Sequence, residues 1–148
     1  KTWSFWKVFD HNFEDCIIKS WNNFTVNSTE GFHTLINKSF PYQSIDSGKF
    51  YKKINSKLSS NSNVSFFKNF NEVNSENSLV FNSVFEGELD KSKLWQHFQG
   101  IEIEISNDIF NDKIVNLMDF NCDQKNDVHF FYTLPFNKNT ALIETTWL

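Results

Sequence analysis

The segment Ile101-Glu102-Ile103-Glu104-Ile105 alternates strictly between apolar and acidic residues. A period of two predicts a β-strand with its isoleucines on one side and its glutamates on the other. Two further apolar segments, at residues 114–120 and 128–134, are separated by turns rich in Asn and Asp. Pro135 ends the second of them, because proline cannot donate a hydrogen bond to a neighbouring strand. With a last apolar segment at residues 140–148, this part of the chain predicts an antiparallel sheet.

Two helices are predicted in the first half of the chain. Asp46 can cap a helix over residues 47–58, in which every fourth residue from Phe50 is apolar and lysines line the other face. Apolar residues four positions apart also predict a helix over residues 12–21.

Short strands are predicted at four further places, residues 23–28, 32–36, 64–70 and 78–85. The predicted fold class is therefore α+β, mostly antiparallel sheet. The 148 residues are enough for a single domain with a buried core, and no linker divides them.

Composition excludes some classes of function. The net charge is −4 and all 14 basic residues are lysines, whereas nucleic-acid binding calls for a basic surface and bidentate phosphate binding calls for arginine. We therefore expect no nucleic-acid partner. Cys16 and Cys122 lack a CxxC spacing, which favours two reduced thiols in a cytoplasmic protein. The four histidines have no partner at ligand spacing, so no metal site is predicted.

Glu144 is the first candidate for chemistry. In Ala141-Leu142-Ile143-Glu144-Thr145-Thr146-Trp147-Leu148 both faces of the predicted strand are largely apolar, which favours a strand covered on both sides. Desolvation of a carboxyl group favours its protonated form, and that form can act as a general acid. The alternative is a glutamate at an exposed strand end.

Three more acids lie in predicted strands. Asp119 follows Met118 in an apolar strand, where it is either a second acid or base beside Glu144 or an aspartate bonded to turn amides. Glu102 and Glu104 share one face of their strand, a common pattern on a solvated surface.

The order of these blocks resembles the flavin-dependent lycopene cyclases, the carotenoid β-cyclases of bacteria and plants. The matching pieces run along most of the chain: Thr2-Trp3-Ser4-Phe5, Tyr42-Gln43-Ser44-Ile45-Asp46-Ser47 followed by Phe50, residues 94–104 with Gly100 before a Glu-rich strand, Met118-Asp119, Phe130-Phe131-Tyr132-Thr133-Leu134-Pro135, and the acid before threonine at Glu144-Thr145.

The resemblance implies that residues 1–148 are an interior segment of a larger flavoprotein, the antiparallel substrate-binding part of an FAD-dependent hydroxylase-like fold. The cofactors would be reduced FAD and NAD(P)H. The chain has no Gly-x-Gly-x-x-Gly turn, so the dinucleotide-binding βαβ unit and the C-terminal part are expected outside this segment. No signal peptide and no run of ~20 apolar residues is visible. A lipid-soluble substrate implies a cytoplasmic protein that is peripheral to the membrane.

The resemblance also implies roles for single residues. Glu144 would protonate a substrate double bond, Asp119 would assist it, and Glu102 would lie in the pocket. The residues that would contact the substrate are Trp95, Phe98, Phe130, Tyr132 and Phe136, and those that would touch the cofactor are Thr2 and Trp3. Aromatic faces also stabilise a carbocation. The alternative is that these rings simply form the core.

The predicted function is that of a lycopene β-cyclase, an intramolecular lyase or isomerase that is active at full length, with this segment alone inactive. The substrate would be lycopene or a related acyclic carotenoid. One alternative is another flavoprotein of the same fold, such as a hydroxylase or a prenyl reductase. A second alternative is a non-catalytic, β-rich carrier of apolar ligands.

Overall fold

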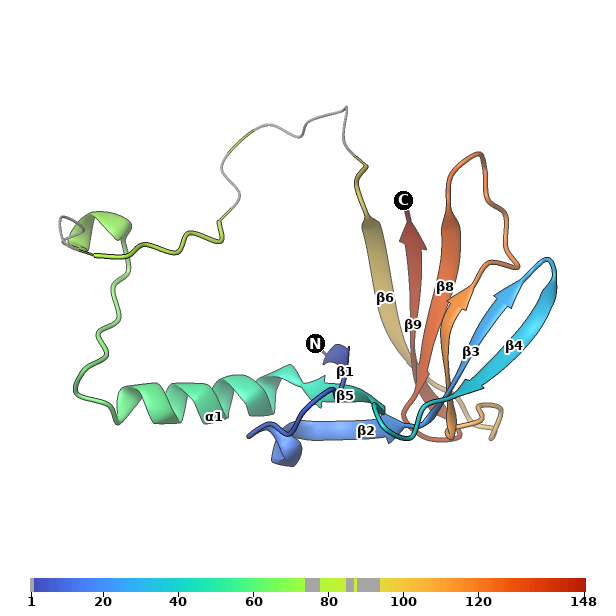
Figure 1. Ribbon diagram of the computed structural model, residues 1–148, viewed down its shortest axis with the longest axis horizontal. Helices are drawn as coiled ribbons and strands as arrows, with labels where there is room; N and C mark the ends of the chain where they lie inside the picture. The colour runs from blue at the N-terminus through green and yellow to red at the C-terminus, as the bar shows by residue number, and fades with distance from the viewer. Residues whose placement is uncertain (1, 74–77, 85–86, 88–93) are drawn as a thin grey trace. The chain divides into compact units, whose positions relative to one another are not determined.

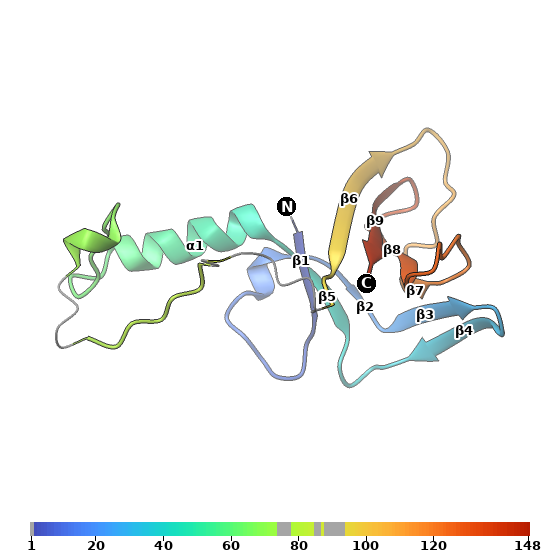
Figure 2. The same ribbon diagram turned by 90° about the horizontal axis from the view of Figure 1, so that it is seen from above.

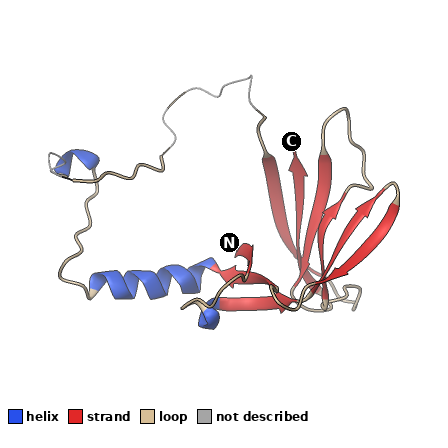
Figure 3. Ribbon diagram, in the orientation of Figure 1, coloured by secondary structure: helices blue, strands red, loops and turns tan. Residues whose placement is uncertain are grey.

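The computed structural model describes residues 2–73, 78–84, 87 and 94–148. In chain order the elements are β1 (Thr2–Trp6), the 3-10 helix η1 (Glu14–Cys16), β2 (Ile17–Trp21), β3 (Asn23–Ser28), β4 (Gly31–Ile36), β5 (Tyr42–Asp46), α1 (Ser47–Ser59), the 3-10 helix η2 (Phe70–Glu72), β6 (His97–Glu104), β7 (Ile114–Asp119), β8 (His129–Pro135) and β9 (Thr140–Trp147). Strands make up most of the regular secondary structure of the described residues, and α1 is their one α-helix (Figures 1 and 3).

The chain divides into two compact units. The first comprises Lys1–Phe50 and Leu94–Leu148 and holds the nine described strands. The second comprises Tyr51–Lys93 and holds most of α1 together with η2. The residues predicted to carry chemistry all belong to the first unit.

The first unit contains two sheets. β1, β5 and β2 form a three-stranded antiparallel sheet with β5 in the centre. The other sheet has six strands in the order β4-β3-β7-β8-β9-β6, and every pair in it is antiparallel except β3 and β7. The two sheets meet where β2 continues into β3 (Figures 1 and 2). The prediction of a largely antiparallel sheet is confirmed.

The strands predicted from residue 101 onward all form, as β6 to β9, and so do the two between residues 23 and 36, as β3 and β4. The strand β8 ends at Pro135, as expected. The helix α1 begins at Ser47, where the Asp46 carboxylate accepts a hydrogen bond from the backbone N–H of Lys49 at 3.0 Å. The predicted cap is therefore present.

The helix predicted over residues 12–21 is wrong. The chain makes the short turn η1 and then runs as the strand β2, which pairs with β5. Burial along β2 alternates, and it is Trp21 that is buried at its end. The four-residue spacing of apolar side chains did not decide the structure here, because pairing with β5 satisfies the backbone hydrogen bonds and buries Trp21.

The strands predicted at residues 64–70 and 78–85 are also wrong. Residues 64–69 are irregular and mostly exposed, and η2 follows them. Residues 78–84 form no strand either, and Phe85 lies outside the described residues. An extended segment gains stability from a neighbour that satisfies its N–H and C=O groups, and neither segment pairs with another described strand.

A compact core joins distant parts of the first unit. Trp21 of β2, Val115 of β7 and Leu134 of β8 are at most 2 % exposed and pack together. The Trp21 indole N–H also donates to the backbone oxygen of Asp112 at 3.2 Å, and Lys19 forms an ion pair with the Asp112 carboxylate at 2.7 Å. Among the described residues, no helix has the length and apolar character needed to cross a bilayer.

Candidate functional site

Glu144 lies in the middle of β9, which is hydrogen-bonded to β8 on one side and to β6 on the other. Its cross-strand neighbours are Tyr132 on β8 and Gly100 on β6. Residues paired in this way point to the same face of a sheet. The register therefore places Gly100, Tyr132 and Glu144 side by side on one face, although they come from three separate sequence blocks.

The Glu144 side chain is half-buried in this position. Burial raises the pKa of its carboxyl group above the ordinary value for glutamate, because the surroundings solvate the charged form poorly. A larger fraction of the group is therefore protonated near neutral pH than in a free side chain. A carboxylic acid in this state can donate a proton.

Two tyrosine hydroxyls and a serine lie beside Glu144. The hydroxyl oxygens of Tyr42 and Tyr132 are 2.8 Å apart and hydrogen-bonded, and the Ser4 side chain hydrogen-bonds to both. Burial is the main cause that raises the pKa of each tyrosine, and the charge of Glu144 adds to it. Both phenols therefore stay neutral.

This cluster lines a cavity of about 280 Å³. Its lining comes from β1, β5, the residue before β6, and the faces of β8 and β9 that carry Glu144. The residues are Thr2, Ser4, Tyr42, Gln96, Phe130, Tyr132, Leu142, Glu144 and Thr146. Hydroxyl groups make up much of this wall, so the cavity is polar on the side of the tyrosines.

A second cavity, of about 530 Å³, lies on the β6 side of Glu144. It is lined by Thr2, Trp3, Phe98, Gly100, Glu102, Leu142 and Glu144. Thr2, Leu142 and Glu144 line both cavities. The carboxyl of Glu144 is thus bordered by a hydroxyl-rich space on one side and by a space walled by Trp3 and Phe98 on the other.

The family model for lycopene cyclase protein matches residues 1–148, the whole length of the sequence. The chain belongs to the lycopene cyclase family. Membership indicates an enzyme of carotenoid biosynthesis with a carotenoid cyclase-like function and a carotenoid substrate. No curated protein and no solved structure matches the chain.

Most of the aromatic residues predicted for this cyclase family member lie around the two cavities. Phe130 and Tyr132 line the smaller cavity, and Phe98 lines the larger one with Trp3. Phe136 packs against the core beside Trp21 and lines another cavity.

Trp95, like Phe136, does not lie at the two cavities beside Glu144. Trp95 precedes β6 and is partly exposed.

Asp119 is not brought to Glu144. It pairs with Phe131, which pairs in turn with Thr145, so the alternation of β9 puts Asp119 on the face opposite to Glu144. The Asp119 carboxylate accepts hydrogen bonds from the side-chain amide of Asn27 at 2.8 Å and from the backbone N–H of Asn121 at 3.0 Å. These contacts fit the alternative of an aspartate that fastens the turn after β7.

Glu102 is closer to the site. It pairs with Leu142, shares the face of Glu144 and lines the larger cavity, with its own side chain exposed. Glu104 follows two residues later on the same face and is exposed as well. The pattern of a solvated strand face holds for both glutamates, and only Glu102 reaches the cavity beside Glu144.

Sequence reasoning missed three residues of the site: Ser4, Tyr42 and Gly100. Ser4 and Tyr42 stood in the two N-terminal pieces of the family resemblance, where no role was assigned to them. Gly100 marked the start of the Glu-rich strand. Gly100 is placed beside Glu144 by the pairing of β6 with β9, whereas Ser4 and Tyr42, which belong to the other sheet, come near it through their hydrogen bonds to Tyr132.

His129 has partners that its sequence position did not suggest. Its ring stacks on Trp147 with centroids 3.6 Å apart, and Nδ1 lies 3.0 Å from the backbone oxygen of Asp123. An oxygen acceptor there requires a proton on Nδ1, so Nε2 accepts from the Thr145 hydroxyl at 2.7 Å. This buried ring holds the loop before β8 onto β9. Among the described residues, no group of three His, Cys, Asp or Glu side chains is arranged to hold a metal ion.

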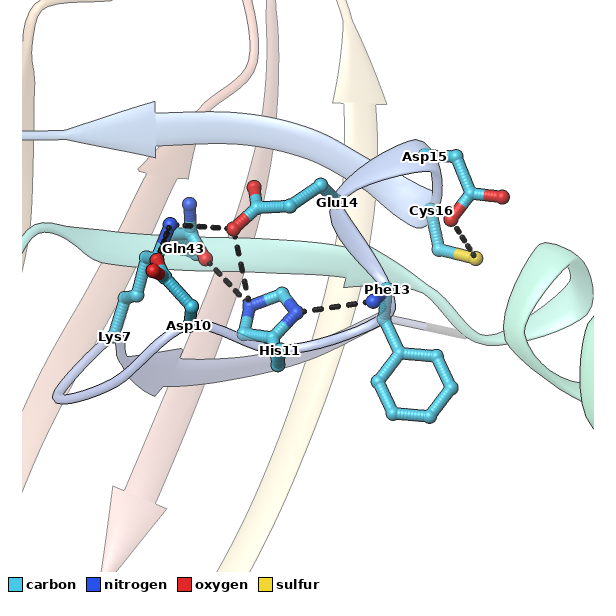
Figure 4. A network of polar contacts seen from close by, with 8 residues as sticks. All are labelled: Lys7, Asp10, His11, Phe13, Glu14, Asp15, Cys16 and Gln43. Carbon is cyan, nitrogen blue, oxygen red and sulfur yellow. Dashed lines mark hydrogen bonds and ion pairs between the residues drawn. The ribbon is translucent and has the colours of Figure 1, made fainter.

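A separate polar network ties the loop after β1 to β5 (Figure 4). Nδ1 of His11 accepts from the backbone N–H of Phe13 at 3.1 Å, so Nε2 carries the proton and donates to the Gln43 amide oxygen at 3.1 Å. Lys7 forms an ion pair with Glu14 in the same network. Gln43 is buried, and the network therefore fixes the path of the loop rather than forming an open site.

Proposed function

We propose that the full-length protein closes a β-ionone ring at an end of lycopene or a related acyclic carotenoid, with Glu144 as the proton donor. The observation that supports this most is the half-buried carboxyl group of Glu144, which lies between two cavities that aromatic residues help to line. Burial raises the pKa of this carboxyl group. An acid of this kind is what the chemistry of a hydrocarbon substrate requires.

A polyene offers no electrophilic carbon to a nucleophile, so the first step is protonation of a terminal C=C bond. The proton from Glu144 adds to one alkene carbon, and the other becomes a tertiary carbocation. The π electrons of an internal C=C then form the new ring C–C bond and move the positive charge into the ring. Loss of a proton from a neighbouring carbon forms the ring double bond. One proton enters and one leaves, so the reaction is an isomerisation with no net redox change.

The proton that leaves the ring needs an acceptor near the cation. After donation, the Glu144 carboxylate is itself a base in the right place. Glu102 lines the same larger cavity and is the other carboxylate within it. Asp119, on the opposite face of the sheet, is not positioned for this transfer.

The walls of the two cavities suit a cationic intermediate. The rings of Trp3 and Phe98 on one side and of Phe130 and Tyr132 on the other surround the position of the acid. Aromatic faces attract a positive charge. Tyr42 and Tyr132 are neutral phenols that hydrogen-bond to each other, so neither competes as a base.

The proposal also includes two cofactors, reduced FAD and NAD(P)H as the electron source, and this part rests on the family alone. It includes a cytoplasmic location peripheral to a membrane as well, which rests on the lipid solubility of the substrate. Among the described residues, the N-terminus of α1 does not fit the pyrophosphate of FAD. At the junction of β5 and α1 the helix N-terminus is capped by the Asp46 carboxylate, which would repel a phosphate. Thr2 and Trp3 line the cavities of Glu144, and their contact with a cofactor stays a prediction. No step above involves the flavin.

The test is Glu144→Gln in the full-length protein, expressed in a bacterium that accumulates lycopene. Glutamine keeps the volume but cannot donate a proton, so the cyclisation rate should fall at least ~100-fold, as for loss of a general acid. The wild type should turn the cells from red to orange-yellow, and the variant cells should stay red.

The control is Lys138→Gln, which changes an exposed side chain in the turn before β9 and should leave the pigment yellow. Equal melting temperatures for the wild type and Glu144→Gln would show that folding is intact. Yellow cells with Glu144→Gln would remove Glu144 as the proton donor and turn attention to Glu102.

A further inference from the structure

Gly100 is directly opposite Glu144 in the pairing of β6 with β9. A Cβ atom at this position would lie 3.3 Å from Oε2 of Glu144 and 3.2 Å from Cδ1 of Leu142. Both distances are shorter than ordinary van der Waals contacts, so any larger residue would push against the carboxyl group. An alanine at this position would require the Glu144 carboxyl and the Leu142 methyl group to shift by a few tenths of an ångström.

The backbone does not require glycine here. Among the glycines of the described residues, Gly31 and Gly87 have a positive φ, and Gly100 does not. Glycine in the interior of a strand lowers stability, because it adds conformational freedom to the unfolded chain and packs no side chain. The feature that calls for a glycine at this position is therefore the room beside Glu144 and Leu142.

The two cavities that share Glu144 differ in what they can hold. The smaller one presents the hydroxyls of Ser4, Tyr42 and Tyr132, which would lose hydrogen-bonding partners or water against a hydrocarbon. The larger one has the apolar residues Trp3, Phe98 and Leu142 in its wall, with Gly100 next to the carboxyl and with Thr2 and Glu102 as its other polar residues. An end group without polar atoms is accommodated at lower cost in the larger cavity.

We propose that the cavity beside Gly100 is the subsite that receives the reacting end group of the hydrocarbon, and that Gly100 is a positioning residue that lets Glu144 face it. The inference rests on the proposed function, since it takes Glu144 as the proton donor. Beyond that function, it states that the proton is delivered from the side of the larger cavity. It also names Gly100 as a second residue that determines whether the carboxyl can reach the alkene. Substrates with a polar or bulkier end group should be rejected at this wall.

The experiment uses the full-length protein, assayed with lycopene in lipid vesicles and by pigment colour in cells. Gly100→Ala should lower kcat by roughly 10- to 100-fold, the loss expected when a reacting group is displaced by a fraction of an ångström to an ångström. Gln99→Ala, which changes the neighbouring side chain on the other face of β6, should leave kcat unchanged. Melting temperatures should separate loss of activity from loss of folding.

Two further variants distinguish positioning from a structural role. Leu142→Val removes the Cδ1 atom that a Cβ at position 100 would meet, so Gly100→Ala combined with Leu142→Val should recover part of the lost activity. Gly100→Ala should also shift the high-pH fall of kcat/KM, because a displaced carboxyl has a different desolvation, and desolvation is what raises its pKa. A purely structural defect would not be relieved by Leu142→Val and would leave the pH profile unchanged.

Wild-type kinetics for Gly100→Ala would overturn the inference and leave the proton donor untouched, since Glu144→Gln tests the donor separately. A loss that the Leu142→Val change does not relieve, with an unchanged pH profile, would overturn it as well. Full activity of Glu144→Gln would instead overturn the proposed function on which the subsite rests.

Discussion

At the scale of single residues, the environment of Glu144 decides what the chain can do. The same glutamate on an exposed strand would be a charged surface group. In β9 it is flanked by two hydrogen-bonded strands, half-buried, and bordered by the neutral hydroxyls of Tyr42 and Tyr132. Burial raises its pKa, which favours the protonated carboxyl group that the proposed function needs.

The raised pKa of Glu144 predicts a pH profile with one limb. In the proposed reaction the protonated acid is the active form, so kcat/KM for lycopene should be level at low pH and fall as the pH rises through the raised pKa. The measurement is a pH series on the purified full-length protein in vesicles. A profile that rises with pH over this range would contradict the assignment, since it would report a base.

The same shift has a consequence for stability. The folded protein holds the proton more tightly than the unfolded chain, so this contribution is fully present below the ordinary glutamate pKa and is lost as the pH rises through the folded one. Above that range, Glu144→Gln should melt at the same temperature as the wild type or higher. A strongly lowered melting temperature would instead give Glu144 a structural role.

The hydrogen bond between Tyr42 and Tyr132 predicts a coupled pair. Either Tyr→Phe change removes the 2.8 Å hydrogen bond from the remaining hydroxyl, which keeps its hydrogen bond to Ser4, and should lower the free energy of unfolding by about 1 kcal/mol. The double change should cost less than the sum of the two, because both single changes remove the same hydrogen bond. Urea unfolding of the three variants gives the coupling, and strict additivity would show that the hydroxyls act independently.

At the scale of elements, strand pairing overrode local sequence preference in both directions. Residues 17–21 have apolar residues at helical spacing and yet form β2, because β5 offers a partner. The segment β5 contains the polar residues Gln43 and Ser44, which are not typical of a central strand. It is nevertheless the central strand of its sheet, and both residues are buried. Residues 64–70 carry the composition of a strand but pair with no described strand and form none.

The turn after β7 predicts how Asp119 matters. The Asp119 carboxylate accepts three hydrogen bonds, from amide groups of Asn27, Asn116 and Asn121. Asp119→Asn replaces one carboxylate oxygen with an NH₂ group, which donates and cannot accept. The free energy of unfolding should fall by roughly 1–3 kcal/mol. The kcat of the folded full-length protein should change little, because Asp119 lies on the face opposite to Glu144. A large loss of kcat at unchanged stability would restore Asp119 as a catalytic partner.

At the scale of the first unit, segments distant in sequence depend on one small core. Trp21, Val115 and Leu134 come from β2, β7 and β8, and the partly buried Tyr132 and Leu142 pack against them. The strands that carry the site residues Tyr132 and Leu142 are therefore held by the same contacts that hold β2. Loosening the core should also misplace the acid.

The core predicts a large effect of Leu134→Ala. Leu134 has no exposed surface, so the change removes buried methyl groups and leaves a cavity, at an expected cost of about 2–5 kcal/mol in the free energy of unfolding. The control Leu35→Ala, at an exposed position of the edge strand β4, should change it by less than ~0.5 kcal/mol. Chemical denaturation of the two variants checks this, and equal losses would mean that the core lies elsewhere.

The sequence by itself determined the strands β6 to β9, the cap of α1 and the acid in an apolar strand, because these depend on period, on local hydrogen bonding and on the neighbours of one residue. The tertiary structure alone decided which residues surround Glu144. Gly100 reaches it through the pairing of β6 with β9, and Ser4 and Tyr42 reach it through their hydrogen bonds to Tyr132 of β8, which lies 90 residues from Tyr42 in the chain. The same register placed Asp119 on the other face, since a strand turns each successive side chain to the opposite side.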